Sequence, residues 1–365
     1  MKNTEVILVV PGTTKIVETS LPQPKEDEVL LQVEYVGICG SDVHSFAHGP
    51  FIPPSDPNQK IGLGHECAGR VVAVGSDVTE FHVGDRVCIE PGVPCGHCRY
   101  CREGRYNICP QVDFMATQPH YRGALTNYLC HPAEYTYHLP ENMSTLEGAL
   151  VEPAAVGMHA AMLAGVRPGM KIAILGAGCI GLMTLQACRL MGATEILVSD
   201  VLPKRLEMAQ SLGATQTIRG NQEDAVSACR SFFGGNGPNL IFETAGSPVT
   251  LQQAVNMVDR GGKILVVGTH SQEVAINFLS INREVSIQTV FRYTNCFPAT
   301  IQAIASGKFD VKSMVTHQYS YTQSQQAFEE SVSQKQNIIK GVIQVAEPFI
   351  EGRNSNARRY SLLGE

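Results

Sequence analysis

The chain has 365 residues, of which 44% are hydrophobic and 17% charged, with a formal net charge of −6. Its length exceeds the roughly 250–300 residues that one hydrophobic core usually supports, so we expect two domains. The negative charge, the lack of a long basic run and the shortness of every apolar stretch argue against a nucleic-acid partner or a membrane span.

The N-terminus reads MKNTEVILVVPGTT, which predicts a first strand rather than a signal peptide. Twelve cysteines in a chain without such a signal are typical of a reducing compartment, where they serve as metal ligands or buried thiols. We therefore expect a soluble, cytoplasmic protein. Residues 1–154 are predicted to be rich in strands, because short Val-rich runs such as VLLQVEYVGI and AGRVVAVG lie between Gly, Pro and Asp.

Within this first domain, three segments carry candidate metal ligands. GICGSDVH supplies Cys39, GLGHECAG supplies His65 and Glu66 beside Cys67, and LVEPAAVG supplies Glu152. One thiolate, one imidazole and one or two carboxylates can hold zinc and still leave a position for water or an alcohol, which is typical of catalytic zinc. Taken singly, each residue could instead have no role in metal binding: Cys39 could be a buried thiol and Glu66 a surface carboxylate.

A second metal pattern lies at 94–109, in the sequence PCGHCRYCREGRYNIC. It places Cys95, Cys98, Cys101 and Cys109 in one polar loop, within the segment 90–112. Four thiolates in a short loop can close a tetrahedron around one zinc ion. Because a closed shell leaves no position for a substrate, we expect this site to be structural.

From 155 to 290 the pattern changes to strands alternating with helices, which predicts a doubly wound parallel sheet. ILGAGCIG supplies Gly176, Gly178 and Gly181 between an apolar strand and a helix, and Asp200 ends the next strand. These are the elements of a dinucleotide-binding fingerprint, in which the acidic residue bonds the adenosine ribose and disfavours a 2′-phosphate. NAD is therefore favoured over NADP, although Lys204 and Arg205 lie close to Asp200.

The segment 291–345 contains no further strand of the nucleotide-binding type, so it is expected to return to the first domain. The last segment, 346–365, contains IEGR (350–353), the recognition sequence of a protease used to remove tags. We treat it as a native tail or a tag remnant, and it carries no functional expectation.

The combined motifs resemble the zinc-dependent medium-chain dehydrogenases over residues 5 to 345. The resemblance is strongest to the polyol branch, the sorbitol (L-iditol) and xylitol dehydrogenases, and ALVEP and FRYTNCFP carry that distinction. It implies an α/β protein with a GroES-like catalytic domain and a Rossmann dinucleotide-binding domain. It also implies NAD-dependent oxidation of a secondary hydroxyl of a polyol to a ketose, with one catalytic and one structural zinc per subunit, in a homotetramer or dimer.

Roles follow from the resemblance residue by residue. Cys39, His65 and Glu66 match the catalytic zinc ligands, with water as the fourth ligand. The other residues with implied roles are, for the cofactor, Gly176, Gly178, Ile180, Gly181, Asp200 and Arg205; for proton transfer, Ser41, His44 and Glu152; and for the substrate, Arg292 and Tyr293. The route of the proton stays open, either through water to Glu152 or through Ser41 and the ribose to His44.

Two departures from the family pattern stand out. The four-cysteine site is complete, whereas some animal sorbitol dehydrogenases lack it, and Ser45 stands where several sorbitol enzymes carry tyrosine. The alternatives are another zinc dehydrogenase of the 2,3-butanediol or threonine type, or a non-catalytic protein that binds NAD and zinc. The complete set of candidate residues argues against the non-catalytic alternative.

Overall fold

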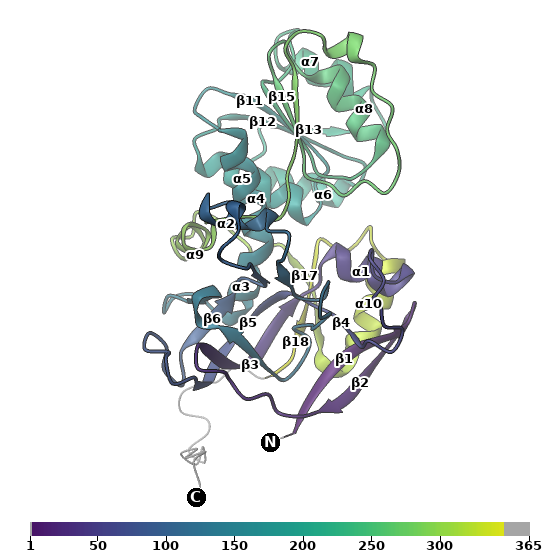
Figure 1. Ribbon diagram of the computed structural model, residues 1–365. Coiled ribbons are helices and arrows are strands. Elements are labelled where there is room, and N and C mark those ends of the chain that lie inside the picture. Colours follow the sequence, from purple (N-terminus) through teal and green to yellow (C-terminus); the bar gives the residue numbers. More distant parts are fainter. Residues whose placement is uncertain (1, 347–365) are drawn as a thin grey trace, which may run out of the picture.

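The computed structural model describes residues 2–346, which form two lobes joined by helix α4 and by the segment that follows β16 (Figure 1). The predicted tail lies, from residue 347 on, outside the described residues. The helices are α1 (Gly40–His48), α2 (Arg99–Arg102), α3 (Thr145–Ala149), α4 (Val151–Ala164), α5 (Cys179–Leu190), α6 (Pro203–Ser211), α7 (Ala225–Phe232), α8 (Pro248–Met257), α9 (Phe297–Ala305) and α10 (Ser324–Ser333). Short 3₁₀ helices occupy Tyr106–Ile108, Ala133–Tyr135, Phe278–Ile281 and Tyr321–Gln323.

The lower lobe in Figure 1 is built on a mostly antiparallel seven-stranded sheet, with β17 and β18 paired in parallel. Its strands are β10 (Thr136–His138), β6 (Arg86–Ile89), β5 (Glu66–Val74), β3 (Glu28–Gly37), β18 (Lys340–Gln344) and β17 (Val315–Ser320), with β9 (Tyr128–Pro132) also on β3. A three-stranded sheet of β2 (Thr13–Thr19), β1 (Asn3–Val10) and β4 (Ile61–Gly62) covers it, and β7 (Gly92–Val93) pairs with β8 (Asp113–Phe114). Nine of the ten residues of β3 are buried, because neighbouring strands cover both of its edges and side chains cover both faces.

The chain returns to this lobe after its excursion into the second one. β18 pairs with β3, with Val342 opposite Gly37 and Ile343 opposite Val36. A strand from the C-terminal part therefore lies inside the N-terminal sheet.

The upper lobe contains a six-stranded sheet that is parallel throughout. The strand order is β13 (Gln216–Arg219), β12 (Glu195–Asp200), β11 (Lys171–Leu175), β14 (Leu240–Glu243), β15 (Lys263–Val266) and β16 (Ser286–Thr289). Because the order reverses between β11 and β14, the carboxyl ends of these two strands form the position where ligands bind in such sheets. This sheet and the antiparallel lobe below it confirm the predicted fold class.

Helix α4 joins the two lobes by packing tightly on α5. A Cβ atom added at Gly157 would lie 2.6 Å from the carbonyl carbon of Met183, so the two helix backbones approach as closely as glycine allows. Apolar residues of both lobes form one continuous core around this contact. None of the helices within residues 2–346 is long and apolar enough to cross a bilayer.

Several ionisable groups are buried among the described residues, and Glu90 is one to which the sequence assigns no role. Glu90 follows β6 and is 1% exposed, and the hydroxyl of Tyr137 donates to its Oε2 at 2.9 Å. Burial raises the pKa of Glu90 from 4.5 to about 7. The folded state therefore holds this proton more tightly than the unfolded chain does.

We predict that Glu90→Gln changes how stability depends on pH. Well below pH 4.5 both states of the parent protein hold the proton. Between about pH 4.5 and 7 the unfolded chain ionises while the folded state still holds its proton, so the parent loses stability over this range. The cost is on the order of 3 kcal/mol, because one pKa unit corresponds to about 1.4 kcal/mol. Relative to the parent, the glutamine variant should gain stability in urea unfolding as the pH rises from about 4.5 to 7 and keep that gain at higher pH; parallel curves would contradict the prediction.

Candidate active site

A cavity of about 550 Å³ lies between the two lobes and is lined by eight of the candidate residues from the sequence. The lower lobe contributes Cys39, His44, Glu66 and Lys340, and the upper lobe contributes Gly176, Gly178, Ile180, Asp200, Arg205 and Thr244. The cavity opens at the carboxyl ends of β11 and β14, where the strand order predicts a ligand. The candidate metal ligands and the dinucleotide fingerprint therefore face one space.

Strand pairing brings the first group of candidate ligands together. In the antiparallel pair β3–β5, Gly37 lies opposite Glu66, so Cys39 just beyond β3 is next to His65 and Glu66. One donor atom from each of Cys39, His65 and Glu66 lies within 4.8 Å of the others. A Cβ at position 37 would overlap the carboxylate of Glu66, so this arrangement requires glycine there. The donor set and its spacing fit a zinc ion with three protein ligands and an open position.

Two residues that the sequence analysis missed hold these ligands in place. Asp42, 2% exposed, lies 3.5 Å from Nδ1 of His65 and accepts the N–H of Gly64 at 2.9 Å. Burial alone would raise the pKa of Asp42, but His65 and nearby backbone N–H groups lower it below its usual value. A carboxylate behind a ligating imidazole fixes the orientation of the ring.

The second missed residue is Lys340, the first residue of β18. It is 3% exposed, its ammonium group contacts the carboxylate of Glu66, and it donates to the carbonyl of Ile38 at 3.0 Å. Burial opposes the charge of Lys340, but Glu66 raises its pKa above the usual value, so the lysine stays charged. The pair engages one oxygen of Glu66 and leaves the other for a metal. Its only sequence signal is a lone charge in the apolar run IIKGVIQV.

Glu152 lies close to this group but is not one of the three clustered donors. It occupies the first turn of α4, and its Oε1 accepts the hydroxyl of Tyr293 at 2.8 Å. Burial raises the pKa of Glu152 to about 7. A carboxyl group with that pKa can take up or release a proton near neutrality.

Arg292 stands beside Tyr293 and is mostly buried. Its guanidinium lies 3.7 Å from the centroid of the Phe114 ring, and Phe114 also packs against the ring of His65. Within residues 2–346, Nη1 of Arg292 has no hydrogen-bond partner. A buried guanidinium with a free donor is suited to bind a hydroxyl of a ligand.

Ser41 and His44 both belong to α1, yet they point to different partners. The hydroxyl of Ser41 donates to Sγ of Cys39 at 3.3 Å, and the ring of His44 stacks on Phe51 with centroids 3.7 Å apart. Burial lowers the pKa of His44. The route predicted for the proton passes from Ser41 to His44 through the cofactor ribose and not by a direct bond, so it stays a prediction.

The second cysteine group lies apart from the cavity. The sulfur atoms of Cys95, Cys98, Cys101 and Cys109 lie within 4.8 Å of one another, and those of Cys98 and Cys101 are 3.5 Å apart. Four thiol groups at this spacing fit a closed tetrahedral zinc site. The geometry therefore agrees with two metal sites of different kinds.

The fingerprint turn has the shape required for a dinucleotide. Gly176 has a φ of 104°, and a Cβ at Gly181 would overlap the Gly176 carbonyl, so only glycine fits at both positions. Asp200 Oδ2 accepts the N–H of Ala177 at 2.7 Å, and Arg205 Nη1 lies 3.9 Å from the same oxygen. Arg205 also donates to the carbonyl of Lys335 across the cavity, at 3.0 Å.

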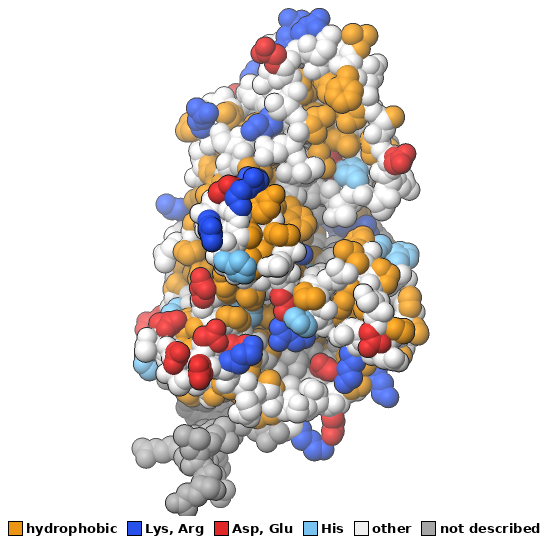
Figure 2. Space-filling model, in the orientation of Figure 1, with side chains coloured by type: hydrophobic (Ala, Val, Ile, Leu, Met, Phe, Trp, Pro, Cys, Tyr) orange, Lys and Arg blue, Asp and Glu red, His pale blue; other side chains and the backbone are white. Residues whose placement is uncertain are grey.

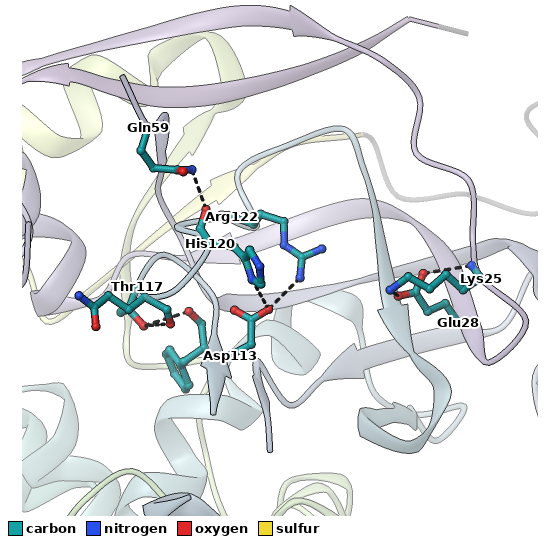
Figure 3. Close-up of polar contacts among 9 residues, drawn as sticks. Lys25, Glu28, Gln59, Asp113, Thr117, His120 and Arg122 are labelled. Carbon is teal, nitrogen blue, oxygen red and sulfur yellow. Dashed lines mark hydrogen bonds and ion pairs between the residues drawn. The ribbon is translucent and has the colours of Figure 1, made fainter. Parts of the chain in front are cut away.

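A second hollow of about 380 Å³ lies on the lower lobe, away from this cavity. Its charged groups are already paired: Asp113 is shared by His120 at 2.8 Å and Arg122 at 3.0 Å, and Lys25 bonds Glu28 at 2.9 Å (Figure 3). No candidate residue from the sequence lies in it. We therefore assign no ligand there.

Comparison with known proteins is consistent with this geometry. Two family models match the chain: the alcohol dehydrogenase GroES-like domain over residues 25–141 and the zinc-binding dehydrogenase over residues 179–306. The uncharacterized zinc-type alcohol dehydrogenase-like protein YdjJ of Escherichia coli is 70% identical over 95% of this chain and all of its own. Sorbitol dehydrogenase of Bacillus subtilis is 43% identical over 92% of this chain and 96% of its own.

Solved structures show the same fold. The crystal structure of ECK1772 from Escherichia coli, an oxidoreductase/dehydrogenase of unknown specificity, is 69% identical and superposes with a TM-score of 0.94 over 95% of this chain and 100% of that one. A zinc-binding dehydrogenase from Sinorhizobium meliloti with bound NADP is 28% identical, with a TM-score of 0.86 over 94% of this chain and 100% of that one. This chain therefore belongs to the zinc-dependent medium-chain dehydrogenases, in the branch of the polyol enzymes.

Proposed function

We propose that the protein oxidises a secondary hydroxyl of a polyol, such as sorbitol, L-iditol or xylitol, to a ketose and reduces NAD. The observation that carries this proposal is the shared cavity: Cys39 and Glu66 line it together with the glycine turn and Asp200. A hydroxyl held at the open position of a zinc site can thus lie next to a nicotinamide ring. The sorbitol dehydrogenases among the relatives support the polyol as substrate.

Cys39, His65 and Glu66 would hold the catalytic ion, and the four cysteines of 95–109 the structural one. Zinc in the first site supplies Lewis acidity, which lowers the pKa of an alcohol, and bound NAD supplies the hydride acceptor. Asp42 keeps the imidazole of His65 oriented, and Lys340 keeps the carboxylate of Glu66 in place. These contacts hold the ligands before the substrate arrives, which avoids the cost of ordering them during the reaction.

Glu152 and Arg292 would act on the polyol itself. With its pKa raised to about 7, Glu152 can accept the hydroxyl proton at neutral pH, and Tyr293 fixes its orientation. Arg292 would donate hydrogen bonds to neighbouring hydroxyls, since its Nη1 has no partner among the described residues. A buried donor of this kind disfavours alcohols without a second hydroxyl, because the donor would then remain unpaired.

NAD rather than NADP is the cofactor that we propose. Asp200 ends β12 with a carboxylate, which would repel a 2′-phosphate. Because the Sinorhizobium meliloti structure contains NADP, the preference of this protein for NAD over NADP is a quantity to measure.

We also propose a cytoplasmic homodimer or homotetramer. All twelve cysteines are free thiols, as expected in a reducing compartment. The upper lobe has an apolar surface near α8 (Figure 2), and its exposed side chains include Val249, Phe278 and Leu279. Light scattering on the purified protein would give the oligomeric state.

The proposal is tested by following NADH formation with a panel of sorbitol, xylitol, L-iditol, galactitol, 2,3-butanediol, threonine and ethanol. We expect NAD reduction with a polyol of five or six carbons, abolished by a chelator and restored by zinc. Turnover of only butanediol or threonine would reject the polyol assignment, and chelator-insensitive turnover would reject the metal assignment.

We predict that Cys39→Ser lowers the zinc content from two ions per chain to one. Turnover should fall at least a thousandfold, because a neutral hydroxyl replaces a thiolate ligand. NADH binding, measured by its fluorescence, should stay within about threefold of the parent value. A variant that retains two zinc ions and full activity would contradict the ligand assignment.

We further predict that Asp200→Ser raises the ratio of kcat/KM for NADP to that for NAD by at least tenfold. Serine removes the like charge that opposes a 2′-phosphate, while Arg205 remains available to bind it. An unchanged ratio would show that Asp200 does not select the cofactor.

A further inference from the structure

The loop with four cysteines contacts the segment that carries Arg292 and Tyr293. We call residues 95–109 the cysteine lobe and residues 291–295 the substrate segment. The two are separated by more than 180 residues in sequence, yet four hydrogen bonds join them directly.

Four hydrogen bonds connect the lobe to the segment. Nδ2 of Asn107 donates to the carbonyl of Phe291, and the Gly104 carbonyl accepts from the Thr294 hydroxyl and from Nδ2 of Asn295. The N–H of Asn295 donates to the hydroxyl of Tyr106. Each donor–acceptor distance is 2.8 Å, which is within the usual range for protein hydrogen bonds.

The segment has a backbone conformation that needs such support. Arg292 and Asn295 have φ values of 51° and 54°, in the left-handed region that side chains other than glycine disfavour. Each such residue costs on the order of 1 kcal/mol and persists where surrounding contacts determine it. Before the segment, Val290 is anchored on β15, and after it Phe297 is buried in α9. Between these anchors the lobe supplies four hydrogen bonds, and the segment also bonds Glu152 and Cys296.

The lobe itself depends on its cysteines. Gly104 lies between Cys101 and Cys109, and its N–H donates to the carbonyl of Cys101 at 3.0 Å. The helix α2 and the following 3₁₀ turn are each too short to be stable alone. Closure of the four thiol groups around an ion would therefore fix the place of the Gly104 carbonyl and of Asn107.

We propose that the cysteine lobe positions the substrate site: it holds the substrate segment and so sets the placement of Arg292 over Phe114 and of Tyr293 against Glu152. Arg292 and Tyr293 are the residues that touch the polyol, and Asn107 and Gly104 are positioning residues that act through them. The structural ion thus contributes to substrate affinity without taking part in the chemistry. This proposal rests on the proposed function, since it assigns the two residues to the substrate.

Asn107→Asp tests the link in the holoenzyme, because it keeps the size of the side chain and replaces the donor to Phe291 with an acceptor. Asn142→Asp is the matched control, since Nδ2 of Asn142 also donates to a backbone carbonyl, that of Ala305, at 2.7 Å and away from the segment. Asn295→Gly is a second variant, which tolerates the positive φ and removes the bond to Gly104.

In Asn107→Asp and Asn295→Gly, we expect hydrogen exchange of the amides of 291–296 to accelerate at least tenfold. KM for the polyol should rise at least fivefold. Zinc content should remain two ions per chain, and the Kd for NADH should stay within twofold of the parent value. Asn142→Asp should match the parent in all four measurements.

Unchanged exchange and unchanged KM in both variants would overturn the link. An equal loss of polyol and NADH affinity would also overturn it, because general loosening affects both ligands. If the parent oxidises no polyol while exchange at 291–296 accelerates in both variants, the proposed function fails and the positioning of the segment by the lobe stands.

Discussion

The buried ion pair of Lys340 with Glu66 is the interaction on which the rest of the site depends. It joins β18 to the start of β5, and the additional bond from Lys340 to the Ile38 carbonyl adds the end of β3. Removing one partner of such a pair leaves an uncompensated charge and costs roughly 3–5 kcal/mol. The C-terminal strand must therefore return to the first sheet in one register. That register places the ammonium group of Lys340 against Glu66, which the pairing of β3 with β5 brings beside Cys39.

The upper lobe meets this site from the opposite side. Its sheet reverses strand order between β11 and β14. The turn at Gly176, which follows β11, is bonded to the residue after β14, because the hydroxyl of Thr244 donates to the carbonyl of Gly176 at 2.8 Å. The dinucleotide turn and the candidate metal ligands therefore belong to different lobes but to one cavity. The tight packing of α4 on α5 holds the two lobes in this relative placement.

The features predicted best from sequence were those encoded over short distances. The parallel sheet, the glycine turn and the four-cysteine group follow from local periodicity and spacing, whereas the family resemblance implied the group of Cys39, His65 and Glu66. The residues of each group lie together in the structure. Lys340, Asp42 and Phe114 were missed because their roles arise only from strand register and packing. Both Ser41 and His44 lie in α1, where Ser41 bonds Cys39 and His44 stacks on Phe51, and the relay through the ribose that would join them stays a prediction.

The glycine at position 37 determines whether Glu66 can lie beside the other two candidate metal ligands. The carboxylate of Glu66 occupies the space that any Cβ at Gly37 would fill. A single methyl group there would displace the carboxylate and leave only a thiolate and an imidazole to bind an ion. It would also take from Lys340 the partner that compensates its buried charge. The number of protein ligands for a metal ion and the charge compensation of Lys340 therefore both depend on the absence of a side chain at position 37.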